Sequence, residues 1–226
     1  MQPEIRPLGD RGLLVELGAD IDPAVNRRVQ RLHRLILREK LWGVVESVPA
    51  YASLLVVYDP LRAAPEALKR RLRGLCALED DGIVEPAPQV VEIPVVYGGE
   101  GGPDLDGVAA YHGLPPEEVI RLHSATVYRV YMIGFTPGFP YMGELPRALD
   151  TPRRETPRTR IPKGSVAIAQ RQTGIYPVVS PGGWQIIGHT PVELFDPRAA
   201  CPSLLAMGDA VRFKPVSARE AAQWRG

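Results

Sequence analysis

Residues 134–188 contain three closely spaced motifs, GFTPGFPYMG (134–143), PRRETPRTRIPKGSVAIAQRQTGIYP (152–177) and SPGGWQIIG (180–188). Glycine allows backbone conformations and close approaches that a Cβ forbids, whereas proline fixes φ and removes a hydrogen-bond donor. A segment of this composition that also carries aromatic and guanidinium side chains is typical of rigid loops that form a binding surface. For any single glycine or proline, a tight turn between strands is an equally good interpretation.

Short apolar runs around these motifs predict a β-rich fold. Strands are expected over residues 127–133, 165–171, 175–179, 184–187, 192–195 and 210–215, and a short helix over 115–123. Turn-rich joints separate the runs and no long helical pattern intervenes, which favours a closed or nearly closed β-barrel. Ser217 and Glu220 form a capping-box pattern, so a short helix is expected at the C-terminal end.

The composition of the chain changes near residue 85. Residues 86–226 hold 18 of the 24 prolines and 16 of the 22 glycines, so the preceding part is more compatible with helices. We place a domain boundary between residues 87 and 88, in a proline-containing segment that suits a linker or a strand entry. The two predicted domains are therefore residues 1–87 and 88–226.

The N-terminal part predicts the order strand, helix, strand, strand, helix, strand. Strands are expected over 12–17, 43–48 and 53–59, and a second helix over 65–78. The first helix is expected to begin at Pro23, because Asp22 before it is a typical N-cap. The run at 90–96 either completes this unit or opens the next domain. This order matches the split β-α-β pattern of ferredoxin-like domains.

Bulk composition limits the classes of function. The 226 residues carry a formal charge of +1, so no global field attracts nucleic acid or an anionic membrane. Cys76 and Cys201 make no metal-binding spacing and are typical of reduced thiols, with a disulfide between them left open. No apolar stretch reaches the roughly 18 residues that span a bilayer, and no secretory signal is evident. We expect a cytoplasmic location.

A basic cluster is the strongest local electrostatic feature. Seven basic residues and only two acidic ones lie between residues 147 and 171. The basic residues are Arg147, Arg153, Arg154, Arg158, Arg160, Lys163 and Arg171. Because guanidinium groups bind carboxylate or phosphate bidentately, the cluster predicts an anionic small-molecule ligand. A solvated basic loop is an equally good interpretation, and nucleic acid is disfavoured because no recognised module is present.

Other motifs leave alternatives open. The sequence Lys163-Gly-Ser lacks the upstream glycine of a phosphate loop, and the GGEGG run at 98–102 precedes no long helix of a dinucleotide fold. Asp104 and Asp106 could ligate Mg²⁺, although helix capping is the better interpretation. His123 could serve as a general base near neutral pH, or it could pack structurally.

The motifs YGGEGGPDLDGVA (97–109), GFTPGFPYMGELP (134–146) and the stretch 151–191 closely resemble the allophanate hydrolase subunit 1 family. That family includes the B subunit of bacterial 5-oxoprolinase (PxpB) and the sporulation-kinase inhibitor KipI. The resemblance covers nearly the whole chain and implies an α+β N-terminal ferredoxin-like domain plus an all-β cyclophilin-like barrel. It also implies a PxpC-like (allophanate hydrolase subunit 2) chain and a PxpA-like chain as partners, with ATP and Mg²⁺ acting at the level of the complex.

The resemblance further implies a subunit that is inactive alone and acts with partners to hydrolyse 5-oxo-L-proline to L-glutamate. His123 and Lys163 are then candidate catalytic residues, and neither a metal ligand nor biotin is expected on this chain. Candidate ligand-binding residues are Arg153, Arg158, Ser165, Gln172, Thr173, Tyr176, Gly182, Gly183 and Trp184.

Two alternatives from other functional classes stay open. One is a KipI-type histidine-kinase inhibitor that binds through an apolar patch. The patch residues would be Phe135, Phe139, Tyr141 and Met142, although core packing also explains them. The other is the carboxyltransferase half of a urea carboxylase or allophanate system.

Overall fold

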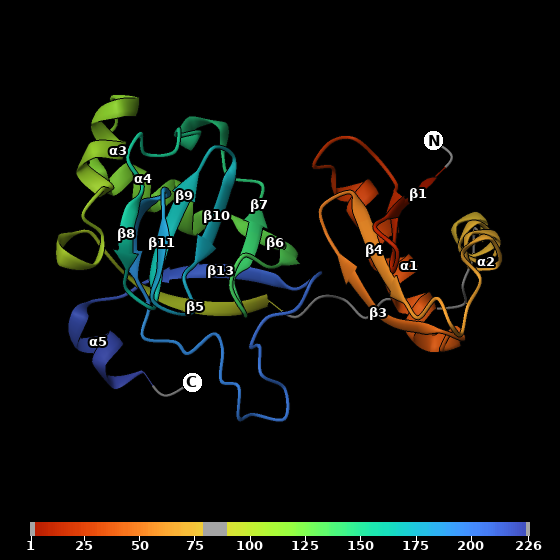
Figure 1. Cartoon of the computed structure of the whole chain (residues 1–226). Coiled ribbons are helices and arrows are strands. Elements are labelled where there is room, and N and C mark those ends of the chain that lie inside the picture. The colour runs from red at the N-terminus through yellow and green to blue at the C-terminus, as the bar shows by residue number, and fades with distance from the viewer. Residues whose placement is uncertain (1–2, 79–89, 225–226) are drawn as a thin grey trace. The chain divides into compact units, whose positions relative to one another are not determined.

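The chain forms two compact units, Met1–Ala87 and Pro88–Gly226, in a computed structural model that describes residues 3–78 and 90–224 (Figure 1). The predicted boundary between residues 87 and 88 lies outside the described residues. Neither cysteine is in a disulfide. None of the described helices is both long and apolar enough to cross a membrane.

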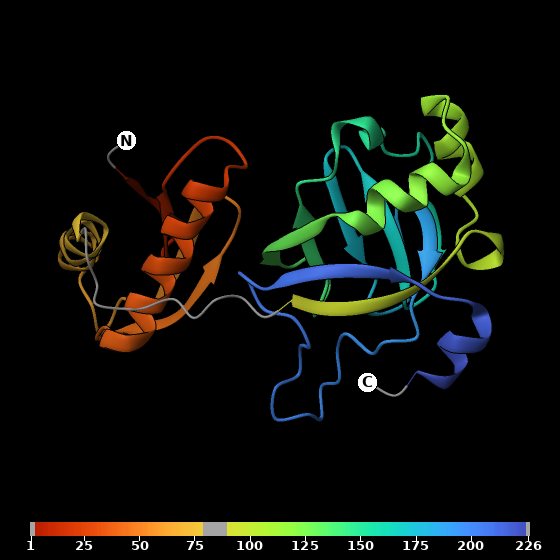
Figure 2. The same cartoon turned by 180° about the vertical axis from the view of Figure 1, so that it is seen from behind.

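The N-terminal unit is a four-stranded antiparallel sheet with two helices. Its strands are β1 (Glu4–Leu8), β2 (Gly12–Glu16), β3 (Val44–Pro49) and β4 (Ser53–Tyr58), in the order β1-β2-β4-β3. Its helices are α1 (Pro23–Glu39), which packs against β3 and β4 (Figure 2), and α2 (Pro65–Ala77). The predicted start of α1 is confirmed, because the Asp22 carboxylate accepts bonds from the backbone N–H groups of Ala24 and Val25 at 2.8 and 2.9 Å.

This sheet departs from the predicted strand order at one edge. Residues 90–96 do not complete it but open the C-terminal unit, which was the second of the two alternatives. The edge beside β2 is instead formed by β1, which the sequence did not predict. The pattern of β1 is weak because Ile5 is its only buried residue and Pro7 interrupts the run.

The C-terminal unit contains a closed barrel of seven strands, which confirms the predicted barrel. The strands are β5 (Val90–Tyr97), β6 (Val127–Ile133), β7 (Pro140–Gly143), β9 (Ser165–Ala169), β10 (Gln172–Ile175), β12 (Gln185–His189) and β13 (Ala210–Pro215). Around the barrel they follow the order β10-β7-β6-β13-β5-β12-β9. The β5–β13 pair is parallel and the other pairs are antiparallel. Closure leaves the barrel without an exposed strand edge.

Further elements cover the barrel. A two-stranded ribbon, β8 (Arg158–Ile161) with β11 (Ser180–Gly182), forms a separate sheet. The helices are α3 (Leu105–His112), α4 (Pro116–Ala125), α5 (Ala218–Gln223) and two 3₁₀ turns, η1 (Gly99–Gly101) and η2 (Arg147–Leu149). α3 packs against β12 and α4 against β13. The predicted capping box opens α5, where the Ser217 hydroxyl accepts from the Glu220 N–H at 3.2 Å.

Two predicted strands are wrong, and four short ones, β7, β8, β10 and β11, were not predicted. Of the strand expected over 175–179, only Ile175 is in a strand, as the last residue of β10; Pro177 follows Tyr176 and has no N–H for a ladder. Residues 192–195 form a loop in which only Phe195 makes an isolated bridge, to Ser203. The strands β7, β8 and β11 are three or four residues long and contain or adjoin proline, so their sequences read as turns.

Side chains along the barrel strands alternate between two environments. In β9, Val166 and Ile168 belong to the core that fills the barrel, whereas Ala167 and Ala169 belong to a second apolar cluster. This alternation is that of any strand with both faces buried. The other members of the second cluster are Phe139, Ile161, Tyr176, Trp184 and Ile186. Because Ile161 comes from β8, the second cluster lies on the outer face of the barrel wall, beneath the ribbon.

Candidate functional site

A pocket of about 270 Å³ opens on the outer face of the barrel wall, beside the ribbon. We call it the aromatic pocket. It is lined by Phe135, Phe139, Tyr141, Arg153, Pro157, Tyr176, Pro181, Gly182, Gly183 and Trp184. Small-molecule sites are typically concave, mostly apolar and furnished with a few polar groups, which describes this pocket. Five of the predicted ligand-binding residues meet here, namely Arg153, Tyr176, Gly182, Gly183 and Trp184.

The aromatic walls of the pocket hold one another in place. The Phe139 ring lies edge-to-face with Tyr176 and Trp184, with centroids 5.1 and 5.6 Å apart. A Cβ on Gly174 would lie 2.8 Å from the tip of the Phe139 ring, so glycine lets this ring rest directly on β10. Phe135 stands at the rim with 58% of its surface exposed. The floor is therefore rigid before any ligand arrives.

The Tyr176 hydroxyl is the most constrained polar group in the pocket. A Cβ on Gly182 would lie only 2.3 Å from the phenol oxygen, so glycine at this position allows the hydroxyl to lie against β11. Burial raises the pKa of Tyr176 to about 12, although a hydrogen bond from the Trp184 backbone acts in the opposite direction. The phenol is accordingly neutral and protonated at physiological pH.

Arg153 supplies the positive charge of the pocket. Its exposed side chain makes no ion pair with any described residue. Burial raises the pKa of Tyr141 and of Tyr176, and the Arg153 charge opposes that rise at both hydroxyls. The guanidinium therefore lies near both phenols, where an anionic ligand can reach it.

Arg158 has a different role from the one predicted. Its guanidinium binds the Asp104 carboxylate through two contacts of 2.8 Å, and Arg154 adds a third at 3.0 Å. The same carboxylate accepts the Ile186 backbone N–H at 2.7 Å. Asp104 occupies the N-cap position of α3 but its side chain makes no capping bond, so the predicted cap is wrong. The cluster instead joins the start of α3 to the ribbon and to β12.

Other members of the basic cluster are also neutralised by distant residues. Lys163, a candidate catalytic residue, forms an ion pair with Glu193, and Arg171 forms one with Glu144 at 3.3 Å. Both acidic partners lie outside residues 147–171, so the local excess of positive charge in the sequence does not form one groove. Of the predicted cationic ligands, Arg153 alone lines the aromatic pocket.

His123 and Thr173 lie on the inner side of the barrel wall. The His123 ring is fully buried, and its two nitrogens contact the Tyr97 hydroxyl at 2.7 Å and the Thr173 hydroxyl at 2.9 Å. The ring stacks on Phe213 with centroids 4.5 Å apart. Burial lowers the pKa of His123 to about 3. It is neutral at physiological pH and lies apart from the aromatic pocket, so its proposed role as proton carrier stays a prediction.

The buried His123 predicts a pH-dependent stability. Its folded pKa of about 3 lies below the ordinary value of 6.5, so the unfolded chain binds a proton first as pH falls. Its stabilisation is complete above pH 6.5 and is lost progressively toward pH 3. From pH 7 to pH 5 the loss due to this group is about 2 kcal/mol. Denaturant titrations at pH 7 and at pH 5 measure the fall in unfolding free energy between the two pH values. We expect this fall to be about 2 kcal/mol smaller in His123→Gln than in the unaltered protein. An equal fall in both proteins contradicts the assignment.

Two other predicted ligand residues do not line the pocket. Ser165 is buried at the start of β9, where its carbonyl accepts the Tyr176 N–H at 2.9 Å. Gln172 opens β10 opposite Ala169 and is half-buried. Ser165 therefore contributes through the backbone that sets the position of Tyr176.

The predicted apolar surface patch does not exist as a group. Phe139 and Met142 are 1% and 0% exposed, so they belong to the interior. Phe139 and Tyr141 line the aromatic pocket instead, together with Phe135, Pro157 and Pro181, none of which was predicted as a ligand residue. The sequence Phe139-Pro-Tyr141-Met142 could have indicated these two pocket residues, because successive side chains of a strand alternate and the first and third therefore share one face.

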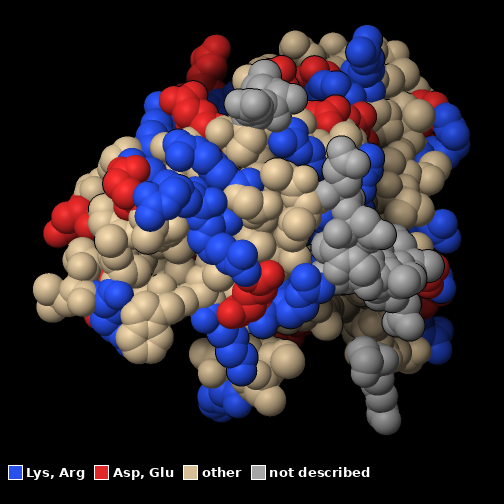
Figure 3. Space-filling model, turned by 90° about the vertical axis from the view of Figure 1, so that its right-hand side faces the viewer, with Lys and Arg blue, Asp and Glu red and all other residues tan. Residues whose placement is uncertain are grey.

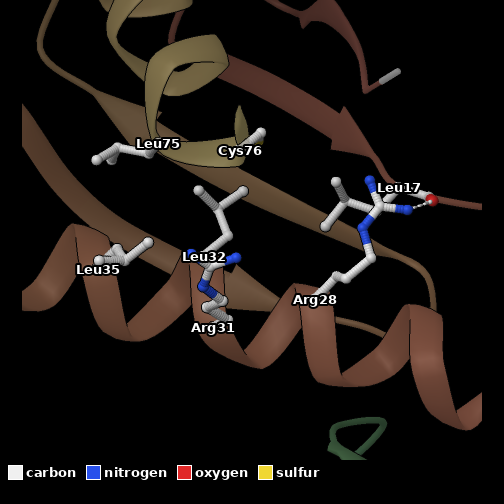
Figure 4. Close-up of a pocket in the computed structure, with 7 residues that line it drawn as sticks. All are labelled: Leu17, Arg28, Arg31, Leu32, Leu35, Leu75 and Cys76. Atoms are coloured by element: carbon white, nitrogen blue, oxygen red, sulfur yellow. Dashed lines mark hydrogen bonds between the residues drawn. The ribbon is translucent and has the colours of Figure 1, made fainter. Parts of the chain in front are cut away.

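A second hollow, in the N-terminal unit, measures only about 30 Å³ (Figure 4). It is lined by Leu17, Arg28, Arg31, Leu32, Leu35, Leu75 and Cys76. The Arg28 side chain reaches across it to donate to the Leu17 carbonyl at 3.1 Å. This volume holds about one or two water molecules, so it is not a site for an organic ligand.

Basic residues also gather on the helices of the N-terminal unit. α1 and α2 carry the basic residues Arg27, Arg28, Arg31, Arg34, Arg38, Lys69, Arg70, Arg71 and Arg73. Their only acidic residues are Glu39 and Glu66, and Figure 3 shows a face on which Lys and Arg predominate. A hollow of about 370 Å³ in this unit, larger than the aromatic pocket, is lined by residues that include Trp42, Arg62 and Arg71. None of the predicted site residues lines it.

Comparisons with known proteins agree with this architecture. The family model for the carboxyltransferase domain, subdomain C and D, matches residues 3–205. The B subunit of 5-oxoprolinase from Escherichia coli O157:H7 is 44% identical over 92% of this chain and 94% of its own length. TTHA0988, whose crystal structure is known, is 43% identical in sequence to this chain, and the two structures superpose with a TM-score of 0.83. The match covers 92% of this chain and 40% of the TTHA0988 chain. The Kluyveromyces lactis urea amidolyase shares the fold, with 22% identity and a TM-score of 0.76. The match covers 98% of this chain and 15% of the amidolyase chain.

The family match includes both units, from the first strand of the N-terminal sheet through most of the barrel unit. Near-complete mutual coverage with the E. coli relative shows that the likeness is not confined to one shared module. The chain therefore belongs to the family of carboxyltransferase domains, subdomain C and D.

Proposed function

We propose that this chain is the B subunit of an ATP-dependent 5-oxoprolinase, which hydrolyses 5-oxo-L-proline to L-glutamate together with partner chains. The E. coli relative of that name supports the proposal through its identity and mutual coverage. The structural observation that carries it is the aromatic pocket, in which the unpaired cation Arg153 faces rigid aromatic walls. This combination suits a small ring that bears one carboxylate.

The ligand's two chemical parts match two parts of the pocket. The carboxylate of 5-oxoproline binds Arg153, because charge-assisted contacts to a guanidinium are among the strongest hydrogen bonds in proteins. The five-membered ring packs against Phe139 and Trp184. The cluster formed by Asp104, Arg154 and Arg158 carries two positive charges and one negative, so it adds a favourable field without being a direct ligand.

The chemistry requires other chains. We propose a PxpC-like chain and a PxpA-like chain as partners, with ATP and Mg²⁺ bound at the level of the complex. Lys163 does not fit the lysine of a phosphate loop, because its turn joins β8 to β9 and its ammonium is paired with Glu193. Among the described residues, no group of three His, Cys, Asp or Glu side chains is placed to hold a metal ion. We therefore assign substrate binding, and no ATP-dependent step, to this chain.

Reconstitution tests this proposal. The purified chain, mixed with its PxpC-like and PxpA-like partners, should release glutamate from 5-oxoproline only when ATP is present. Omission of this chain should abolish the release, because the complex would lack the aromatic pocket. Full activity of the two partners without this chain, or no activity of the complete mixture, would contradict the proposal.

A second candidate function is the carboxyltransferase half of a biotin-dependent system. The family model and the fold shared with urea amidolyase favour it, although that likeness covers only 15% of the amidolyase chain. Transfer of a carboxyl group from carboxybiotin to urea by this chain and a partner is the discriminating assay. Histidine-kinase inhibition also stays a prediction, with Phe135 as the exposed aromatic residue of its proposed surface.

The finer fold names are proposals as well. The strand order β2-β4-β3 is that of a ferredoxin-like domain, and so are the positions of α1 after β2 and α2 after β4 in the chain. β1 occupies the sheet edge where such a domain has its last strand. We propose this relationship for the N-terminal unit and a cyclophilin-like fold for the barrel. A cytoplasmic location stays a prediction.

A further inference from the structure

The Tyr176 hydroxyl is held by backbone rather than by mobile side chains. The absence of a Cβ on Gly182 lets the phenol oxygen lie against β11, because a Cβ there would come within 2.3 Å of that oxygen. The ring itself is 2% exposed and contacts Phe139 edge-to-face. Both the position and the orientation of this phenol are therefore set by the fold.

The hydroxyl hydrogen is left without a protein acceptor. The neutral phenol carries one hydrogen that it can donate. No described residue accepts a hydrogen bond from it, yet Tyr176 lines the pocket that Arg153 also lines. A hydroxyl that borders the pocket and has no partner among the described residues can donate to an acceptor on a ligand bound there.

We propose that Tyr176 donates this hydrogen bond to a ring carbonyl oxygen of the ligand, so that the aromatic pocket selects cyclic carboxylates that carry a neutral carbonyl. The proposal rests on the proposed function and extends it, because it names the group that distinguishes a lactam from a simple ring acid. Arg153 binds the carboxylate and Tyr176 the carbonyl, at two separate points of the pocket. A phenol remains a donor over the whole physiological pH range, whereas a carboxylate in its place would repel both ligand oxygens.

Three small probes separate the two contacts. 5-Oxo-L-proline has both the carboxylate and the lactam carbonyl, cyclopentanecarboxylate has only the acid, and 2-pyrrolidinone has only the lactam. Each is titrated into the full chain while ¹H–¹⁵N spectra report the Gly182 and Gly183 amides and the Trp184 indole. For the unaltered protein we expect 5-oxoproline to bind about 10-fold tighter than cyclopentanecarboxylate, which is the ratio for one buried hydrogen bond.

Tyr176→Phe should remove this preference. The variant keeps the ring and its packing, so its affinity for 5-oxoproline and 2-pyrrolidinone should fall about 10-fold, while that for cyclopentanecarboxylate changes less than about 2-fold. Tyr111→Phe is the control; it removes the hydroxyl of a tyrosine on α3 that is 63% exposed and does not line the pocket, so it should keep the preference. Spectra outside the pocket show whether each variant remains folded.

Three results would overturn the proposal. They are equal affinity of the unaltered protein for 5-oxoproline and cyclopentanecarboxylate, an equal loss for all three probes in Tyr176→Phe, and no saturable binding of any probe. The first comparison uses no variant, so it stands even if Tyr176→Phe fails to fold. Failure of the proposed function is distinguishable, since it appears as absent ATP-dependent glutamate release while the probe preferences are intact.

Discussion

Replacing Arg153 by Gln is expected to weaken the binding of 5-oxoproline by about 10- to 100-fold, the value of a charge-assisted hydrogen bond. Arg153 lines the aromatic pocket and has no acidic partner among the described residues, so its removal takes the pocket's only direct cation. Because the side chain is exposed and unpaired, the fold should tolerate the change. Titration of the purified variant measures the affinity, and in the reconstituted complex the loss should appear in kcat/KM.

Arg160→Gln is the matched control for this prediction. Arg160 belongs to the same basic segment and is also exposed, but it does not line the pocket. Its replacement removes the same charge and should change the affinity less than about 2-fold, because solvent screens an exposed charge. Equal losses in the two variants would show that the segment acts through its general field, and not through a contact with Arg153.

Asp104→Asn is expected to lower the unfolding free energy of the barrel unit by about 2–3 kcal/mol. The carboxylate is 8% exposed and receives hydrogen bonds from Arg158, Arg154 and the Ile186 N–H. Loss of one partner of a buried charge pair costs about 3–5 kcal/mol, and the partial exposure of both arginines lowers that figure. The measurement is the denaturant midpoint of the full chain.

Glu193→Gln provides the comparison for Asp104. It also removes one carboxylate that pairs with a basic residue, Lys163, but both side chains of that pair are about half exposed. Such surface pairs contribute about 0–1 kcal/mol, so the midpoint should hardly move. If Asp104→Asn changed the denaturant midpoint as little as Glu193→Gln, the ion pairs of Asp104 would not stabilise the packing of the ribbon on α3.

Patterns within one element allowed prediction of much of the fold. Asp22 and Pro23 marked the start of α1, and short apolar runs indicated the barrel, because capping and strand burial depend on neighbours in sequence. β1 could not be found in this way, since only Ile5 of its residues is buried. Residues 90–96 were ambiguous because only pairing partners distant in sequence, in β12 and β13, decide which sheet they join.

The site was predicted in part for the same reason. Glycine and aromatic motifs indicated Tyr176, Gly182 and Trp184, which the barrel and ribbon bring together. The role of Arg158 could not be predicted, because its partner Asp104 lies 54 residues away in sequence. Thr173 occurs in the same motifs and His123 ends the helix predicted over 115–123, but the barrel wall separates their contacts from the pocket, a distinction that depends on strand register.

A crystal structure of the reconstituted complex with 5-oxo-L-proline tests the central claim most directly. The ligand should occupy the aromatic pocket, with its carboxylate within hydrogen-bond distance of Arg153 and its ring against Trp184. A ligand bound elsewhere, with the aromatic pocket of this chain empty at saturating concentration, would contradict the account.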